Sequence, residues 1–452
     1  MTTTTNEQQP PGVSREGEAM QGGDLRAIWS WVSRAAWSER MLAALEEGVR
    51  GGVWFSLIDK VWSEATLREA AIKVIANGGV AGVDHVGVKE FERNLDENLA
   101  RLSAELRTGQ YRPQAVRRVN IPKPGSHETR PLGIPTVRDR VVQGAVRHVI
   151  EPIFEKRFAQ HSYGFRPKHG CKDALRQVKR LLKNGFVHVV DADLKSYFDT
   201  IPHVPLMERV RERVADGRVL GLIESFLKAG IFDGLREWTP ESGAPQGAVL
   251  SPLLSNLYLN PLDHEMAAGG WEMVRYADDF VILCRSAEEA QRALDKVTEW
   301  TASAGLTLHP TKTRIVDVRA EGFDFLGYRF QTIRNGNIRQ WPRKKSRDKL
   351  KDTIRAKTKR TNGRSLDHTI KDVNLTLRGW YEYFQHSCKP TFEPLDKWIR
   401  RRLRGILRKR MKRHGQARSL ADHLRWPNHY FAERGLFSLM TAYALSRQSC
   451  LR

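Results

Sequence analysis

Two apolar runs that flank a pair of adjacent aspartates place the tightest constraint on how this chain can fold. Residues 273–276 and 280–283 have the composition of buried strands, and Ala277-Asp278-Asp279 separates them. Short runs joined in this way predict an antiparallel β-hairpin. Its turn carries two carboxylates, which cost free energy in an apolar setting unless they are paired or bind a metal ion. An Asp-Asp pair in a solvated turn is the plain alternative.

A second apolar run also ends in acids. Residues 186–193 form a short β-branched segment that closes on Asp191 and Asp193. The segment after the hairpin reads as a helix, with a capping box of Ser286 and Glu289 at its start and Gly305 at its end. The order strand, helix, hairpin, helix, strand predicts an antiparallel sheet of the split βαβ type, backed by helices.

The composition sets the class of protein. A chain of 452 residues is long enough for several domains, and 40% hydrophobic with 28% charged residues is typical of a soluble globular protein. No run approaches the roughly 18 apolar residues of a membrane helix, so no membrane partner is expected. The four cysteines lie far apart, without the paired spacing of zinc or redox sites, which indicates a reducing compartment.

The charge of the chain is concentrated near its end. Residues 341–452 hold 29 Lys and Arg against 9 Asp and Glu, so this segment carries +20 of the formal charge of +23. The segment is predicted to be helical from about Lys344 and has aromatic residues spread among its cations. Such a region suits both duplex backbones and structured RNA, although a helical domain with an aromatic core explains part of the pattern.

Several motifs, in the order expected, resemble those of reverse transcriptases. Tyr276-Ala277-Asp278-Asp279 resembles the signature of that family, and residues 193–199 resemble its first palm motif. The resemblance implies that Asp193, Asp278 and Asp279 are catalytic and bind two Mg²⁺ ions for phosphoryl transfer. It also places Phe198 at the steric gate that excludes a ribose 2′-hydroxyl. Without the motif, Phe198 would be read as an ordinary core residue.

Further motifs imply contacts with the incoming deoxynucleotide. Residues 121–135 resemble the fingers hairpin in which Lys123 and Arg130 hold the triphosphate, and a solvated basic hairpin is the alternative. Residues 243–254 resemble the block in which Gln246 and Gly247 lie close to the base pair, although Ala244 and Ala248 depart from its usual form. Residues 305–313 resemble the motif whose lysine, here Lys312, acts as a general acid toward pyrophosphate; a surface lysine is the alternative.

The chain is identified as a member of the group II intron branch by Arg378-Gly379-Trp380-Tyr381, which resembles the maturase-type thumb. The resemblance implies nucleic-acid contacts along the fingers, the primer-grip hairpin and the thumb. The candidates for these contacts are Arg166, Gly327, Arg378, Trp380, Arg401 and Arg402. A structural ion pair is an equal alternative for Arg166. Many relatives add a carboxy-terminal nuclease, and the sequence given predicts the type that lacks it.

The implied fold class is α+β, a right-hand polymerase with helical fingers, an antiparallel-sheet palm and an α-helical thumb or maturase region. We expect a disordered leader at 1–23, fingers at 24–185, the palm at 186–335 and the thumb with its basic RNA- and DNA-binding region at 336–452. The implied partners are an RNA template, which the branch suggests is group II intron RNA, a DNA primer or target, and dNTPs. The implied activity is RNA-directed DNA synthesis, with splicing of the intron RNA and retrohoming, in the cytoplasm beside the nucleoid.

Two other functions stay open on the sequence. A related reverse transcriptase could serve its host in defence, diversity generation or spacer acquisition. A non-catalytic RNA-binding splicing factor could use the same scaffold, although binding alone needs none of Asp193, Asp278, Asp279, Phe198 or Gln246. The oligomeric state, the fidelity, the intron RNA and the DNA target cannot be read from the chain.

Overall fold

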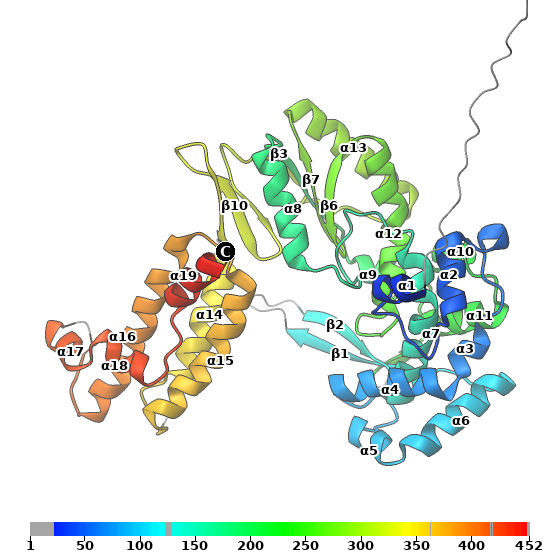
Figure 1. The fold of residues 1–452 in the computed structure, drawn as a ribbon, viewed down its shortest axis with the longest axis horizontal. Helices are drawn as coiled ribbons and strands as arrows, with labels where there is room; N and C mark the ends of the chain where they lie inside the picture. The colour runs from blue at the N-terminus through cyan, green and yellow to red at the C-terminus, as the bar shows by residue number, and fades with distance from the viewer. Residues whose placement is uncertain are drawn as a thin grey trace, which may run out of the picture. The chain divides into compact units, whose positions relative to one another are not determined.

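The computed structural model describes residues 22–122, 129–234, 236–361, 363–415, 417 and 419–449 (Figure 1). Nearly all of the predicted leader lies outside these residues, as does Lys123, and the first helix begins at Gly22. The chain divides into two compact units. The first contains the chain up to 157, with 203–241 and 245–251, and the second contains 158–202, 242–244 and 252–452.

The first unit is mainly helical. Its central helix α7 is buried along most of its length, because α4 and other helices cover it, and Gly144 lies against Ala70. Thr136 caps its amino end by accepting a hydrogen bond from the backbone N of Asp139. The helices of this unit are α1 (Gly22–Ile28), α2 (Glu39–Glu47), η1 (Arg50–Gly52), α3 (Ile58–Trp62), α4 (Glu64–Asn77), α5 (Val88–Arg93), α6 (Leu95–Thr108), α7 (Val137–Glu155), α10 (His203–Arg211) and α11 (Gly217–Leu227).

A small sheet completes the first unit. Strand β1 (Val116–Pro122) pairs antiparallel with β2 (Thr129–Ile134) and parallel with β4 (Ile231–Asp233), which pairs with β5 (Arg236–Trp238). The β1–β2 pair is the hairpin expected at residues 121–135, and its register places Ile121 opposite Arg130.

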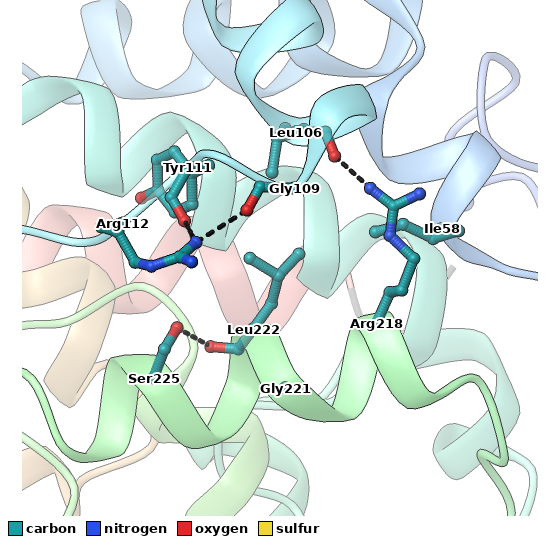
Figure 2. A pocket seen from close by; sticks show the side chains of 9 residues that line it. All are labelled: Ile58, Leu106, Gly109, Tyr111, Arg112, Arg218, Gly221, Leu222 and Ser225. Atoms are coloured by element: carbon teal, nitrogen blue, oxygen red, sulfur yellow. Dashed lines mark hydrogen bonds between the residues drawn. The ribbon is translucent and has the colours of Figure 1, made fainter.

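A pocket of about 350 Å³ lies where α6 ends (Figure 2). Arg218 of α11 donates hydrogen bonds to the carbonyls of Leu106 and Arg107, and Arg112 donates to the carbonyl of Gly109 at 2.8 Å. These carbonyls lie at the carboxyl end of the helix, which attracts cations because of the helix dipole. Arg218 therefore ties the end of α6 to α11, while Arg112 closes the turn that follows the helix.

The second unit is built on an antiparallel sheet in the order β6-β7-β3-β8. This arrangement confirms the antiparallel palm predicted from the order of the motifs. The strands are β6 (Glu272–Tyr276), β7 (Asp279–Cys284), β3 (His188–Asp193) and β8 (Arg314–Asp317), and the helices nearby are α8 (Cys171–Lys183), α9 (Tyr197–Thr200), α12 (Ser251–Ala268), whose first residue belongs to the first unit, and α13 (Ala287–Ser303). Ser286 caps α13 as expected, whereas the Glu289 carboxylate bonds to the backbone N of Arg285.

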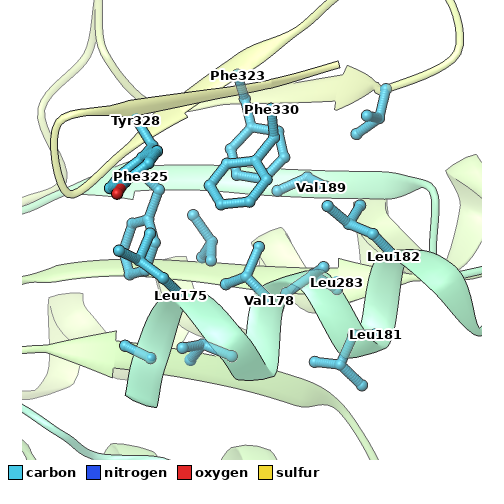
Figure 3. Close-up of a cluster of buried hydrophobic side chains, with 14 of the residues drawn as sticks. Leu175, Val178, Leu181, Leu182, Val189, Leu283, Phe323, Phe325, Tyr328 and Phe330 are labelled. Carbon is cyan, nitrogen blue, oxygen red and sulfur yellow. The ribbon is translucent and has the colours of Figure 1, made fainter. Parts of the chain in front are cut away.

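One face of this sheet is covered by α8 and by the hairpin of β9 (Phe323–Phe325) and β10 (Tyr328–Thr332) (Figure 3). Leucine and valine side chains of α8 meet Phe323, Phe325, Tyr328 and Phe330 there, together with Val189 and Leu283 of the sheet. Strand β11 (Ile338–Pro342) pairs with β10. Alternate residues of a strand point to the same face, so Asp191 and Asp193 share the face of Val189.

The rest of the second unit is a helical bundle with its own apolar core. Its elements are α14 (Lys344–Lys357), α15 (Leu366–Phe384), η2 (Lys389–Thr391), α16 (Phe392–Arg410), α17 (Leu420–Arg425), α18 (Asn428–Glu433) and α19 (Leu439–Ser449). Within the described ranges no helix is both long and apolar enough to cross a membrane.

Candidate active site

The carboxylates predicted to be catalytic meet at one end of the palm sheet. Asp193 is the last residue of β3 and is the register partner of Asp279, the first residue of β7. Tyr276 pairs with Asp279 on the other side, so Ala277 and Asp278 form the turn of the β6–β7 hairpin. The predicted hairpin with acids at its turn is therefore present, and a neighbouring strand brings the third acid to it.

The shape of the turn depends on close packing beneath it. Ala277 has a φ of 60°, a left-handed conformation that costs free energy for a residue with a Cβ. Gly164 lies against this turn so closely that a Cβ at Gly164 would come within 2.2 Å of the Ala277 N. No side chain fits at position 164 unless the turn moves.

A buried arginine holds the turn from the sheet side. Arg275 is fully buried and its guanidinium donates to the carbonyl of Ala277 at 2.8 Å and to the Asn256 Oδ1 at 2.9 Å. Its Nε donates to Asp263 at 2.7 Å in an ion pair that is itself fully buried. The Asn256 amide then donates to the carbonyl of Gly164 at 2.7 Å. The network ties α12, β6 and the loop at 164 to the turn that carries Asp278.

Like charges are crowded at this end of the sheet. Burial raises the pKa of Asp279 to about 7, with further increases from the nearby carboxylates of Asp191, Asp278 and Asp193. Burial also raises the pKa of Asp191 to about 6, although Arg314 lowers it in part. Carboxylates whose ionised form is disfavoured by one another attract a cation into the space that they share.

One such cation comes from the chain. The Lys312 Nζ lies 2.5 Å from the Asp193 Oδ2. The segment before Lys312 is held beside the end of β3, because the backbone N of His309 donates to the Asp193 carbonyl at 2.7 Å and Leu308 bridges to Leu194. The predicted lysine is thus placed at a predicted metal ligand.

The acids suit a divalent cation in ligand type and charge, because carboxylate oxygens are the ligands that hard cations such as Mg²⁺ prefer. Asp193 and Asp279 are register partners on neighbouring strands, so their side chains lie on the same face of the sheet, and Asp278 precedes Asp279. In the part of the chain that the structure describes, no group of three or more His, Cys, Asp or Glu side chains is arranged to hold a metal ion.

Phe198 follows the end of β3 in the short helix α9. Its ring lies 5.6 Å from that of Tyr197 and 6.4 Å from that of Phe165, both in edge-to-face geometry. Its carbonyl accepts a hydrogen bond from the backbone N of Ala244 at 2.7 Å. Tyr197 is buried and its hydroxyl donates to the Ser255 carbonyl, which fixes α9 against α12.

The remaining predicted nucleotide contacts belong to the first unit. The backbone N of Gly133 in β2 donates to the carbonyl of Gln246 at 2.6 Å, and Gly247 has a φ of 106° with Leu132 and the Gly133 carbonyl beside it. Arg130 is exposed on the same strand β2. Arg130, Gln246 and Gly247 are thus brought together by one strand and the loop that bonds to it.

The predicted nucleic-acid contacts lie in different settings. The Arg166 side chain is mostly buried and donates to the carbonyls of Ala159 and Ser162, both at 2.6 Å. Gly327 forms the β9–β10 turn with a φ of 79°, and Trp380 packs 4.8 Å from Phe384. Arg378 is exposed over the ring of Phe437, and Arg402 donates a hydrogen bond to Thr358, the residue that follows α14.

The chain matches two known families over separate segments. Residues 121–330 match the reverse transcriptase (RNA-dependent DNA polymerase) family, and residues 347–426 match the group II intron maturase-specific domain. Protein YkfC of Escherichia coli (strain K12) is 38% identical over 305 residues, which cover 58% of this chain and 79% of that protein. The chain belongs to the group II intron-encoded reverse transcriptases. The family membership predicted from the motifs is confirmed.

Two other similar proteins are named as intron proteins. The group II intron-encoded protein LtrA of Lactococcus lactis subsp. cremoris is 42% identical over 168 residues, covering 37% of this chain and 28% of that protein. The putative COX1/OXI3 intron 1 protein of Saccharomyces cerevisiae is 27% identical over 369 residues, covering 68% of this chain and 43% of that protein. The chain therefore spans less than half of these two relatives.

This group II intron-encoded reverse transcriptase is an RNA-directed DNA polymerase of the predicted α+β class, with an antiparallel palm sheet. Reasoning from the sequence missed the partners of Arg275, namely Asp263 and Asn256 on α12. A signal was present, because an arginine within an apolar strand and an aspartate within an apolar helix each need a buried partner. The pairing itself joins segments that no local pattern connects.

Proposed function

We propose that this reverse transcriptase copies RNA into DNA with two Mg²⁺ ions held by Asp193, Asp278 and Asp279. The observation that carries the proposal is the pairing of Asp193 with Asp279 at the end of the sheet, with Asp278 in the adjoining turn. Ions held there would lower the pKa of a primer 3′-hydroxyl and neutralise charge on the triphosphate and the leaving pyrophosphate. Crowding of the carboxylates supports the proposal, because a divalent cation relieves it.

The other residues that the motifs identify have distinct tasks in this proposal. Lys312 balances the charge of Asp193 in the free protein and donates a proton to pyrophosphate when the nucleotide is bound. Phe198 closes the space that a ribose 2′-hydroxyl would need. Arg130 binds the triphosphate together with Lys123, which lies outside the described residues, and Gln246 with Gly247 lines the nascent base pair.

The helical bundle supplies the contacts with RNA. A cavity of about 520 Å³ opens on α16, between α17 and α18, and cations surround it. The lining residues are Pro394, Lys397, Trp398, Arg400, Arg401, Arg404, His423 and Asn428. Arg404 is buried, and its burial, followed by the charge of neighbouring Arg400, lowers its pKa. An unbalanced cluster of this kind attracts phosphate groups, so we assign Arg401 to binding of the RNA backbone.

The partner that fits both regions is a group II intron RNA, whose splicing the protein promotes before it copies the RNA at a DNA target. The match of residues 347–426 to the maturase-specific domain supports this assignment. Retrohoming of the intron would follow from DNA synthesis primed at the target. Both steps place the protein in the cytoplasm beside the nucleoid.

Splicing and polymerisation can be tested separately. RNA transcribed from the sequence that flanks this reading frame is incubated at low Mg²⁺ with wild-type protein or with the Asp278→Ala, Asp279→Ala variant. We expect both proteins to promote release of the intron, because RNA binding does not use the acids, while only the wild type makes DNA. DNA synthesis without any effect on splicing would contradict the maturase role and favour an enzyme in host use.

A further inference from the structure

A strained aromatic residue touches the proposed steric gate. Phe165 has a φ of 59°, a left-handed conformation that bulky residues rarely adopt. The residue is 40% exposed, so burial does not explain why a phenylalanine stands there. Strain that persists in a structure is a reason to look for a function. The contact that the ring makes is with Phe198, at 6.4 Å between centroids and 74° between planes.

The loop around Phe165 is fixed on both sides, which is what keeps the strained conformation in place. Before it, the backbone N of Tyr163 donates to the Arg275 carbonyl at 2.8 Å, and the carbonyl of Gly164 accepts from Asn256 at 2.7 Å. After it, the buried Arg166 side chain bonds back to the carbonyls of Ala159 and Ser162. The backbone at 165 therefore has little freedom, and the direction of its Cα–Cβ bond is set.

The same loop lies beneath the catalytic turn. Gly164 packs against Tyr276 and Ala277, so the residue that follows it is anchored to the turn that carries Asp278. On its other side Phe198 contacts Tyr197, whose hydroxyl is bonded to the Ser255 carbonyl. The gate ring thus has one aromatic neighbour from its own helix and one from the loop under the acids.

We infer that Phe165 is a specificity-determining residue that holds the ring of Phe198 in the position that excludes ribonucleotides. A gate excludes a 2′-hydroxyl only while its ring stays in one rotamer, and an edge-to-face neighbour restricts rotation out of it. The inference rests on the proposed function of Phe198 as the gate. Phe165 acts through Phe198 and is not itself a catalytic residue.

The test uses a substitution that should lower selectivity without lowering the stability of the fold. Phe165→Gly removes the ring and also the strain, because glycine adopts positive φ readily. We expect its thermal midpoint to equal or exceed that of the wild type. We expect its preference for dNTP over rNTP, measured as the ratio of kcat/KM in primer extension, to fall about tenfold. A tenfold change corresponds to about 1.4 kcal/mol, within the range of one edge-to-face pair.

Three further variants complete the experiment. Phe165→Tyr keeps the ring and should retain selectivity within about twofold. Phe165→Asn, which also tolerates left-handed backbone, should repeat the loss. His85→Gly relieves a similar strain, at a φ of 57° in the first unit, without touching Phe198, so it should leave selectivity unchanged.

Phe198→Ala distinguishes the role of Phe198 as the gate from the role of Phe165 as its support. If it abolishes discrimination while Phe165→Gly and Phe165→Asn stay within twofold of wild type, the gate stands and the role of Phe165 is overturned. If Phe198→Ala leaves discrimination intact, the gate assignment fails and the inference fails with it. A large drop in the midpoint of both Phe165 variants would make the ring part of the core and would also overturn it.

Discussion

At the scale of single residues, Asp279 lies where burial and neighbouring carboxylates disfavour its ionised form. It is mostly buried among other carboxylates, and its pKa is raised to about 7. We predict that Asp279→Asn abolishes DNA synthesis and yet raises the thermal midpoint of the metal-free protein at pH 8, because one of several crowded negative charges is removed. Differential scanning calorimetry in the presence of a chelator measures the midpoint.

Asp193→Asn is the matched control. It should also abolish DNA synthesis. Because it loses the ion pair with Lys312, it should not raise the thermal midpoint. An equal rise for both variants would contradict the view that like-charge crowding is concentrated on Asp279.

His148 of α7 gives a prediction about acid. Its side chain is buried beside Lys73, whose Nζ lies 2.8 Å from the His148 Nε2. Burial, and to a smaller extent the charge of Lys73, lowers the pKa of His148 to about 3. The folded protein holds this ring neutral, whereas the unfolded chain protonates it near pH 6.5. Stability from this group is therefore present above pH 6.5 and is lost as the pH falls.

The expected slope is about 1.4 kcal/mol of unfolding free energy for each pH unit between about 6 and 3. His148→Gln keeps an acceptor for Lys73 but cannot bind the proton. Urea titrations at several pH values give the unfolding free energy as a function of pH. In the variant, the slope of this free energy against pH should be smaller by the contribution of one proton, about 1.4 kcal/mol for each pH unit. An unchanged slope would show that another group dominates the pH dependence.

At the scale of elements, the catalytic turn depends on what lies beneath it. We predict that Gly164→Ala lowers kcat by at least about 100-fold, because the new Cβ must displace the Ala277 backbone and a shift of about 1 Å near the reacting atoms is enough for such a loss. Steady-state primer extension measures the effect. Gly87→Ala, at a position in the first unit where a Cβ meets nothing within 4 Å, is the control and should leave kcat unchanged.

The buried pair under the hairpin makes a second prediction at this scale. Asp263→Ala leaves Arg275 charged and fully buried without its partner, and removal of one member of such a pair costs about 3–5 kcal/mol. Replacing both residues by apolar ones of similar size, Arg275→Met with Asp263→Leu, should restore much of the unfolding free energy but not the hydrogen bond to Ala277, so kcat should stay low. Recovery of full activity in the double variant would show that the hydrogen bond does not position the turn.

Local patterns were sufficient for some of these elements and insufficient for others. The β6–β7 hairpin and the strand before Asp193 could be predicted, because apolar runs broken by acids determine both the strands and the chemistry at their ends. The left-handed backbone of Phe165 could not, since neighbours distant in sequence impose it. The motif with Arg166 suggested a nucleic-acid contact, and in the structure this side chain donates hydrogen bonds to the backbone of its own loop. Its contact with nucleic acid stays a prediction.

At the scale of the whole molecule, the charge of the helical bundle should determine how the protein binds RNA. Each phosphate neutralised on a single strand contributes about −0.7 to the slope of log K against log salt. We predict that Arg400→Gln with Arg401→Gln weakens RNA binding and reduces the slope by about 1.4. Filter binding across a salt series measures it, with Lys89→Gln and Arg93→Gln on α5 as the matched change of charge. Equal effects from the two pairs would show that net charge matters and the cavity on α16 does not.

The central claim is that the acids at the end of the palm sheet carry out RNA-directed DNA synthesis. The most direct test is primer extension by the purified protein on an RNA template with dNTPs and Mg²⁺, beside the Asp278→Ala, Asp279→Ala variant. The account predicts full-length DNA from the wild type and none from the variant, with equal binding of the primed template. Synthesis by both proteins would place the chemistry elsewhere, and synthesis by neither, with RNA binding intact, would contradict the polymerase and favour a splicing factor.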